Sequence, residues 1–272
     1  MGRVNPFFRL LYNDFIKGVI QRYKYFLIAF LFFSFICFEF GIKTNNFDCS
    51  VFDFLLNFFV GNESFNIQSK EKIDISIIWI IFHSILSLIV GFYVSDDIKK
   101  SASSLIVRVR SKKIWWSSKF IWCIISVFVY YVVYLFTIIL FCAIFGDLSL
   151  TTNTQITQKI FDIDISLVKN TDLFLVFFII PIITSMAVSV FQITLGLIIK
   201  PVYSFLIIVT VMVCSSFYAN PFLIFNFSMI CRYDYFSSKS NITLYNGILI
   251  SFFIMVSSYI IGIIVIKKKD II

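Results

Sequence analysis

Long apolar runs, separated by short polar and charged segments, dominate the pattern of this chain. A helix needs about 20 apolar residues to cross the hydrocarbon core of a bilayer, and it satisfies its own backbone hydrogen bonds there. Each long run therefore predicts a membrane-spanning helix. The six expected spans are residues 25–42, 75–94, 120–145, 173–199, 202–218 and 247–266.

Composition agrees with this pattern and excludes a water-soluble globule. Of 272 residues, 60% are hydrophobic and 14% are charged, whereas soluble proteins average about 45–50% apolar and about 25% charged residues. We therefore expect an all-α integral membrane protein with a single transmembrane domain over residues 1–272. Only Lys200 and Pro201 separate the fourth and fifth spans, and proline is favoured in a first helical turn, so a tight hairpin is expected there.

The basic residues predict the orientation of the spans. Residues 1–24, the loop 95–119, Lys200 and the tail after residue 266 carry 16 of the 23 Lys and Arg but 4 of the 15 Asp and Glu. By the positive-inside rule these segments are cytoplasmic, so both termini lie inside. The net charge of +8 then reflects topology and contact with membrane lipids rather than nucleic-acid binding. Trp115 and Trp116 are expected in an aromatic belt at the inner interface.

Residues 1–24 carry a helical pattern of their own, which predicts an amphipathic helix on the cytoplasmic leaflet. A plain basic flank that only fixes topology is the alternative interpretation. Leu11, Phe15 and Val19 share one face, and Arg9, Asn13, Lys17, Gln21 and Lys24 share the other.

The loop 95–119 shows the same pattern, which predicts a short helix presenting a narrow apolar stripe to a partner. A basic loop that only sets topology is again the alternative. The apolar positions are Ile98, Ala102, Leu105 and Val109, and Lys100, Ser104, Arg108 and Lys112 lie on another face.

Two apolar segments expected on the outer side are too short or too charged to span. Residues 47–60 include Asp48 and Asp53, and residues 220–236 include Arg232 and Asp234. We expect interfacial or re-entrant segments, the second being a hairpin before the last span. The second segment could enter the membrane only under a cover of protein, because unpaired backbone groups are costly in lipid.

The residue inventory excludes several chemistries. One histidine, His83, cannot build a zinc site that needs two or three imidazoles. Glycines are never closer than fifteen residues apart, so no glycine-rich phosphate loop exists and ATP cannot bind by that route. We expect no catalytic residues, no metal and no cofactor. A disulfide between Cys49 and Cys231 is left open.

Polar residues inside the spans are the first place to look for function, because charges there are costly. Glu39, His83 and Gln192 are the candidates for a substrate path, and packing residues are the alternative interpretation. Two stripes of small and weakly polar residues are expected to be packing seams between helices. These are Ser185, Ser189, Gln192 and Gly196 in the fourth span, and Ser251, Ser258 and Gly262 in the sixth.

Taken together, these features resemble a type-2 ABC exporter permease over essentially the whole chain. The most specific stretch is VSDDIKKSASSLIVRVRSKKIWWSSK at residues 94–119, which is similar to the coupling-helix region of that family, with Ser101 and Ala102 where the family has Gly-Thr. The stretch NPFLIFNFSMICR at residues 220–232 is similar to the outer re-entrant region of permeases for peptide-antibiotic export or immunity.

The resemblance implies a transport subunit without a motor of its own. ATP hydrolysis would take place in a separate pair of ATP-binding subunits, and a second permease copy or paralogue would complete the transporter in the bacterial cytoplasmic membrane. An amphipathic peptide or lipid-like molecule is the expected cargo. Alternatives are a non-transporting immunity or sensor protein and, less well supported, a membrane-embedded enzyme or channel. The residues implied in coupling to the ATPase are Asp97, Ile98, Ala102, Leu105, Arg108, Val109, Arg110, Lys112 and Lys113.

Overall fold

The computed structural model describes residues 6–44, 49–62, 76–99, 111–163, 168, 170–236 and 241–268. Regular secondary structure in these ranges is entirely helical, apart from an isolated bridge between Cys49 and Gly146. The prediction of an all-α protein is therefore confirmed. In chain order the first elements are α1 (Pro6–Phe15), η1 (Ile16–Ile20), α2 (Tyr23–Lys43), α3 (Val51–Phe59), α4 (Ile77–Gly91), α5 (Tyr93–Asp97) and α7 (Lys112–Phe145). They are followed by α8 (Thr154–Ile160), α9 (Asn170–Phe174), η3 (Leu175–Ile179), α10 (Ile180–Ile198), α11 (Pro201–Phe217), η4 (Ile224–Ser228), η5 (Ile230–Arg232) and α12 (Leu244–Lys268).

Five helices in the described part of the chain are long and apolar enough to cross a membrane, which makes the chain a multi-pass membrane protein. Each of them overlaps one of the predicted spans. They are Tyr23–Lys43, Ile77–Asp97, Lys112–Phe145, Thr171–Ile198 and Leu244–Lys268.

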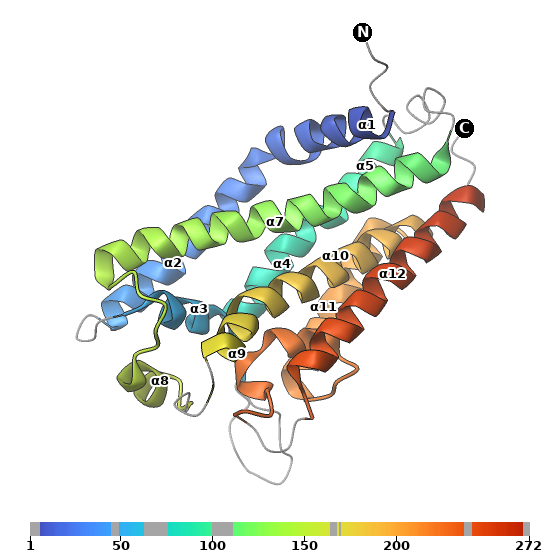
Figure 1. The fold of residues 1–272 in the computed structure, drawn as a ribbon. Coiled ribbons are helices and arrows are strands. Elements are labelled where there is room, and N and C mark those ends of the chain that lie inside the picture. Colours follow the sequence, from blue (N-terminus) through green and yellow to red (C-terminus); the bar gives the residue numbers. More distant parts are fainter. Residues whose placement is uncertain are drawn as a thin grey trace.

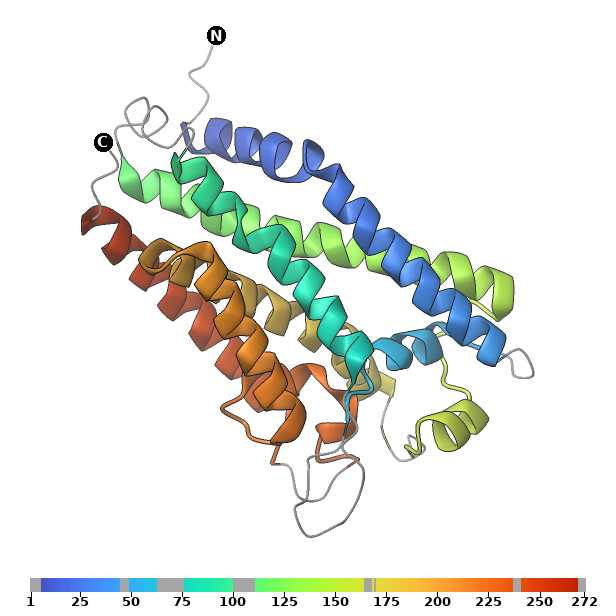
Figure 2. The same cartoon turned by 180° about the vertical axis from the view of Figure 1, so that it is seen from behind.

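The predicted fifth span corresponds to α11, which has 17 residues and is about 26 Å long at 1.5 Å per residue. That length is at the lower limit for a hydrocarbon core of about 30 Å. The helix begins at Pro201, as the missing N–H of proline permits. Seen from behind, α4 and α5 lie between α2 and α11 (Figure 2).

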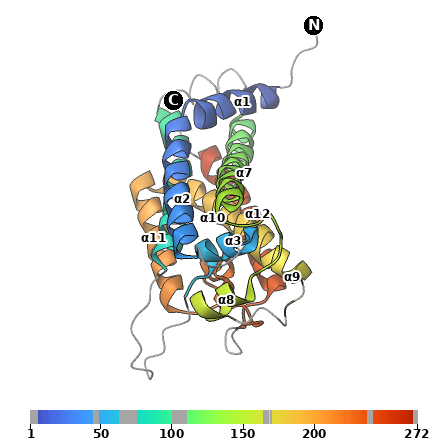
Figure 3. The same cartoon turned by 90° about the vertical axis from the view of Figure 1, so that its left-hand side faces the viewer.

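Several helix ends meet at one end of the bundle, where α1 lies across the long helices (Figures 1 and 3). We call this the basic end. It comprises α1, the end of α5 at Asp97, the start of α7 at Lys112, the α10–α11 connection at Lys200 and the end of α12 at Lys268. The segments α3, α8, η4 and η5 lie toward the other end.

The helix α7 differs from expectation because it begins at Lys112, eight residues before the predicted span. Ser111 caps it, with Oγ accepting a hydrogen bond from the Ile114 amide at 3.3 Å. Its 34 residues extend about 51 Å, well beyond the hydrocarbon thickness. The last part of the expected loop 95–119 is therefore the first two turns of α7, and α5 continues to Asp97 at the other side of that loop.

The N-terminal amphipathic segment forms α1 followed by the π-helical turn η1. Its buried residues include Leu10, Asp14 and Gly18, spaced by four positions, and this face rests on α7. Gly18 permits the close approach, because a Cβ there would lie 2.2 Å from the Trp122 indole nitrogen.

The short helix α3, part of the first segment expected on the outer side, is buried inside the bundle rather than exposed at its surface. Ser50 and Asp53 form a capping box at its start, which satisfies amide groups that would otherwise be unpaired. Phe58 of α3 packs against Phe33, Phe82 and Tyr134 of three other helices. Other helices of the bundle therefore cover α3.

The second segment expected on the outer side is held by Arg232, which is buried. The guanidinium group donates to the carbonyl oxygens of Ser216 at 2.7 Å and Tyr218 at 3.1 Å, and also to that of Ser215. Nε donates to the Asn62 carbonyl at 2.9 Å. Arg232 therefore caps the carboxyl end of α11, where carbonyl groups lack helical partners. Burial lowers its pKa to about 10, so the side chain stays charged at neutral pH.

Candidate functional site

A buried cluster of three charged side chains lies at the basic end. Lys119 of α7 forms ion pairs with Asp14 of α1 and with Asp97 at the end of α5, the second at 2.7 Å. The exposed fractions of these side chains are 1% for Lys119, 1% for Asp14 and 3% for Asp97. One ammonium group thus joins three helical segments that are far apart in sequence.

Neutral donors complete the coordination of both carboxylates. Asp14 accepts hydrogen bonds from Ser118 Oγ at 2.6 Å and Tyr93 Oη at 2.9 Å. Asp97 accepts one from Trp115 Nε1 at 3.2 Å. A buried ion pair is tolerated only when additional hydrogen bonds satisfy its remaining atoms, because desolvation of each charge costs several kcal/mol. These donors meet that requirement.

Aromatic rings close the cluster around the ammonium group. Lys119 Nζ lies 4.9 Å from the centroid of the Tyr93 ring and 5.2 Å from that of the Trp115 ring. Both distances are within the range of cation–π attraction. Nearby, Arg22 pairs with Asp96 at 2.6 Å and its guanidinium group lies 5.2 Å from the Tyr93 ring centroid. A second, more exposed ion pair therefore continues the same network.

This geometry ties the end of α5 to the start of α7, on the two sides of the loop 98–111. Asp97 ends α5 just before it, and Lys119 lies two turns into α7 just after it. The segments α1, α5 and α7 therefore share one ion cluster.

The structure places part of the expected coupling set. Asp97 belongs to the cluster, Ile98 packs against the hydrophobic core, and Lys112 donates to the Lys267 carbonyl at 3.4 Å. Lys113 is exposed in the first turn of α7. The remaining expected residues lie outside the described residues, and these are Ala102, Leu105, Arg108, Val109 and Arg110.

Sequence reasoning missed Asp14, the central acceptor of the cluster. It was counted only as one acid among many bases. The available signal was its position four residues from both Leu10 and Gly18, on the side of the helix that faces the bundle. An acid on such a face needs a buried cationic partner, which the sequence alone does not identify.

The two indole rings expected in an aromatic belt are instead buried in the bundle. Trp115 donates to Asp97, and Trp116 Nε1 donates to the Tyr259 carbonyl of α12 at 3.1 Å. Because α7 begins earlier than expected, both residues are helical and face neighbouring helices rather than lipid headgroups.

Two of the three candidate path residues, His83 and Gln192, line the same small cavity in the interior. Ser87 Oγ donates to Gln192 Oε1 at 2.7 Å, and Gln192 Nε2 donates to the Ser87 carbonyl at 3.0 Å. His83 lines the same small cavity, whose volume is about 10 Å³. Glu39 is exposed on α2 and is not part of this lining. The cavity is about the size of one water molecule.

The polar stripes form contacts between helices, as expected for packing seams. Tyr131 of α7 pairs with Ser185 of α10 at 2.9 Å. Thr194 of α10 donates to the Ser258 carbonyl of α12 at 3.3 Å. Hydrogen bonds of this kind hold apolar helices together in a membrane.

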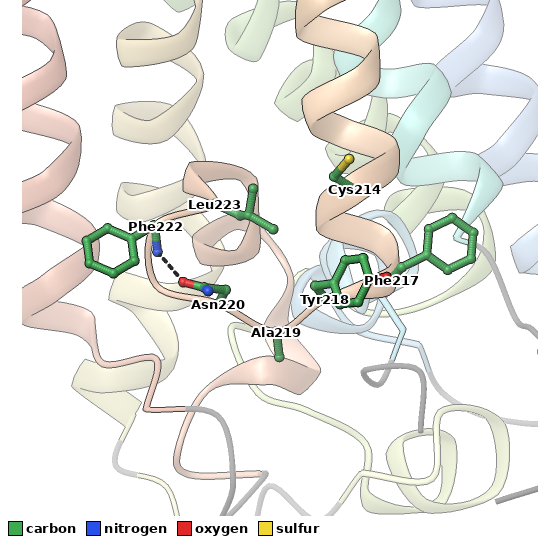
Figure 4. Close-up of a pocket in the computed structure, with 7 residues that line it drawn as sticks. All are labelled: Cys214, Phe217, Tyr218, Ala219, Asn220, Phe222 and Leu223. Carbon is green, nitrogen blue, oxygen red and sulfur yellow. Dashed lines mark hydrogen bonds between the residues drawn. The ribbon is translucent and has the colours of Figure 1, made fainter. Parts of the chain in front are cut away.

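A separate hollow of about 570 Å³ lies at the end of α11 away from the basic end. Figure 4 shows the rings of Phe217 and Phe222 pointing to opposite sides of the loop, with Asn220 between them. Asn220 Oδ1 accepts from the Phe222 amide at 2.9 Å, and Phe222 is 89% exposed. The residues that line this hollow carry no formal charge, so it suits apolar groups.

All six cysteines lie in the described part of the chain. No disulfide links Cys49 to Cys231. Among the described residues no group of three or more His, Cys, Asp or Glu side chains could hold a metal ion. No family model, curated protein or solved structure matches this chain.

Proposed function

We propose that this chain is the membrane subunit of an ATP-driven exporter of the type-2 ABC permease class. It moves an amphipathic peptide or a lipid-like molecule across the bacterial cytoplasmic membrane, with both termini inside and with α11 as a sixth span. A separate pair of ATP-binding subunits and a second permease copy or paralogue complete the assembly.

The observation that carries this proposal is the buried cluster of Asp14, Asp97 and Lys119. A motor subunit that pushes on the loop 98–111 needs rigid attachment points on both sides of that loop. The cluster supplies them, because its ion pairs join the end of α5 to α7 and to α1. The expected apolar stripe of the loop then serves as the docking face for the ATPase.

The distribution of buried charge supports an external energy source. The buried acids and bases among the described residues, His83 apart, are Asp14, Asp53, Asp97, Lys119 and Arg232. They lie toward the two ends of the bundle, and a proton-driven carrier needs a series of titratable groups across the membrane. The neutral middle of the bundle suits a carrier that receives its motion from a partner.

The experiment that tests this function is copurification with the product of a neighbouring ATP-binding gene, followed by cargo-stimulated ATP hydrolysis in liposomes. The discriminating variant is Leu105→Asp, which places a charge on the expected docking stripe. It should abolish copurification while the protein still inserts and purifies at the wild-type level.

Ser104→Asp is the matched control, because it adds the same charge on the polar face of the same segment. Wild-type copurification and ATPase coupling in the Leu105→Asp variant would overturn the assignment of the loop. A chain that never associates with an ATP-binding protein would instead support the non-transporting immunity or sensor alternative.

A further inference from the structure

A hollow beside the charge cluster has its own chemistry. It opens at the basic end between the end of α5 and the α10–α11 connection, and its volume is about 510 Å³. Lys99 and Lys200 line it from the two sides, and both are exposed. Two basic residues from separate segments therefore border one shared space.

The charge of this hollow is positive. Asp96 is the one acid among its lining residues, and its carboxylate pairs with Arg22 at 2.6 Å. That pair is neutral as a unit, so the charges of Lys99 and Lys200 are left to attract an anion. The amino end of α11 adds a favourable backbone dipole to a site that the hollow and the lysines already define.

The wall of the hollow is apolar on the side of the α10–α11 connection. Ile198 and Val202 line it and are more than half exposed, at 57% and 53%. Ile198 ends α10 and Val202 lies in the first turn of α11. Acyl chains cover apolar side chains on the lipid-facing sides of such helices. A ligand with an anionic head and apolar chains matches both parts of the lining.

We propose that this hollow binds the headgroup of an anionic phospholipid. The ammonium groups of Lys99 and Lys200 pair with phosphate oxygens, as charge-assisted hydrogen bonds to phosphate do in other sites. The acyl chains run along Ile198 and Val202. The bound lipid links the beginning of the basic loop to the α10–α11 hairpin. This proposal is independent of the transport function.

Native mass spectrometry of the full-length protein in detergent tests the proposal. The protein is titrated with phosphatidylglycerol and, separately, with phosphatidylcholine of the same acyl chains. We expect one tightly bound phosphatidylglycerol and a clear preference over phosphatidylcholine. In the double variant Lys99→Gln/Lys200→Gln, phosphatidylglycerol should bind on the order of 10- to 30-fold more weakly, because each lysine near a membrane contributes about 1 kcal/mol.

The matched control is Lys24→Gln/Lys268→Gln, which removes two exposed charges at the same end but outside the hollow. It should keep the wild-type affinity. Unchanged phosphatidylglycerol binding in the test variant, or an equal loss in the control, would overturn the site. Inorganic phosphate that displaces the lipid and binds by itself with the same lysine dependence would assign the hollow to a soluble anion and overturn the lipid. Unfolding temperatures of both variants verify that each is folded.

Discussion

Lys119 Nζ lies 2.7 Å from Asp97 Oδ2, and the same ammonium group also contacts Asp14. These residues are on α7, at the end of α5 and on α1. Because all three side chains are buried, water cannot take the place of the Lys119 ammonium group as the partner of the two carboxylates. The stability of the protein and the relative positions of α1, α5 and α7 should therefore depend on the same ammonium group.

Removing the cation should be strongly destabilising. Lys119→Met leaves two buried carboxylates without their shared counter-ion, and breaking such a pair typically costs about 3–5 kcal/mol. The unfolding temperature in detergent should fall markedly. Lys113→Met, an exposed lysine of the same helix, should change it little. Equal effects of both variants would contradict a structural role for the cluster.

The loss of folding stability caused by Lys119→Met should be smaller when one of the two acids is removed as well. Asp14→Asn takes away one of the two stranded charges, so Asp14→Asn/Lys119→Met should be less unstable than the sum of the single variants. A double-mutant cycle from chemical or thermal unfolding gives the coupling free energy. Strict additivity would show that the two side chains do not interact.

A second prediction concerns the interior hydrogen bonds between Ser87 and Gln192. A Cβ on Gly91 would lie 2.2 Å from Gln192 Nε2, so Gly91→Ala must displace the amide and break the pair. We expect a loss of about 1–3 kcal/mol from overpacking. In the control Gly196→Ala, the nearest atom is Ser204 Oγ at an ordinary 3.7 Å, and alanine is favoured in a helix. A control that is as unstable as Gly91→Ala would refute this explanation.

A third prediction concerns Arg232 and the segment before α12. Arg232→Met should leave the carbonyl groups at the end of α11 without donors, at a cost of about 3 kcal/mol or more. Arg232→Lys should rescue only part of the loss, because one ammonium group cannot reproduce the planar fork. Cys231, which is 9% exposed, should become more reactive toward a thiol reagent in both variants, and Cys231→Ser controls for the other thiols. Full rescue by lysine would show that charge alone suffices.

A fourth prediction is a pH dependence at the short helix α3. Burial raises the pKa of the Asp53 carboxyl above 3.8, although hydrogen bonds from Ser50 and Asn153 oppose the rise. Folded protein therefore holds this proton more tightly than unfolded protein does. The stabilising contribution is present below the unfolded pKa and is lost as pH rises through the folded pKa.

Comparison of the wild type with Asp53→Asn isolates this effect, since asparagine has no charge to bury. As pH rises above the ordinary Asp pKa of 3.8, the unfolding temperature of Asp53→Asn should rise relative to that of the wild type. The measurement is thermal unfolding in detergent at each pH. A relative fall would mean that the hydrogen bonds to the carboxylate outweigh its burial.

The sequence by itself determined the helices and the membrane environment. Both depend on local properties, because hydropathy over about 20 residues decides whether a helix can cross a bilayer. The pattern of residues 1–24 likewise predicted a separate helix before the first long one. The sequence did not predict that α7 begins at Lys112. The basic residues of this segment led us to expect a loop, whereas the Ser111 cap starts the helix there.

Tertiary structure decided which polar groups are buried and with which partners. Asp14 and Lys119 are separated by 105 positions, and nothing in either local sequence marks them as a pair. Tryptophan is common at membrane interfaces, but packing turns the indole N–H of Trp115 toward Asp97. Arg232 caps α11, which ends at Phe217, fifteen residues earlier. Such contacts depend on how helices pack, and packing is set by many distant side chains at once.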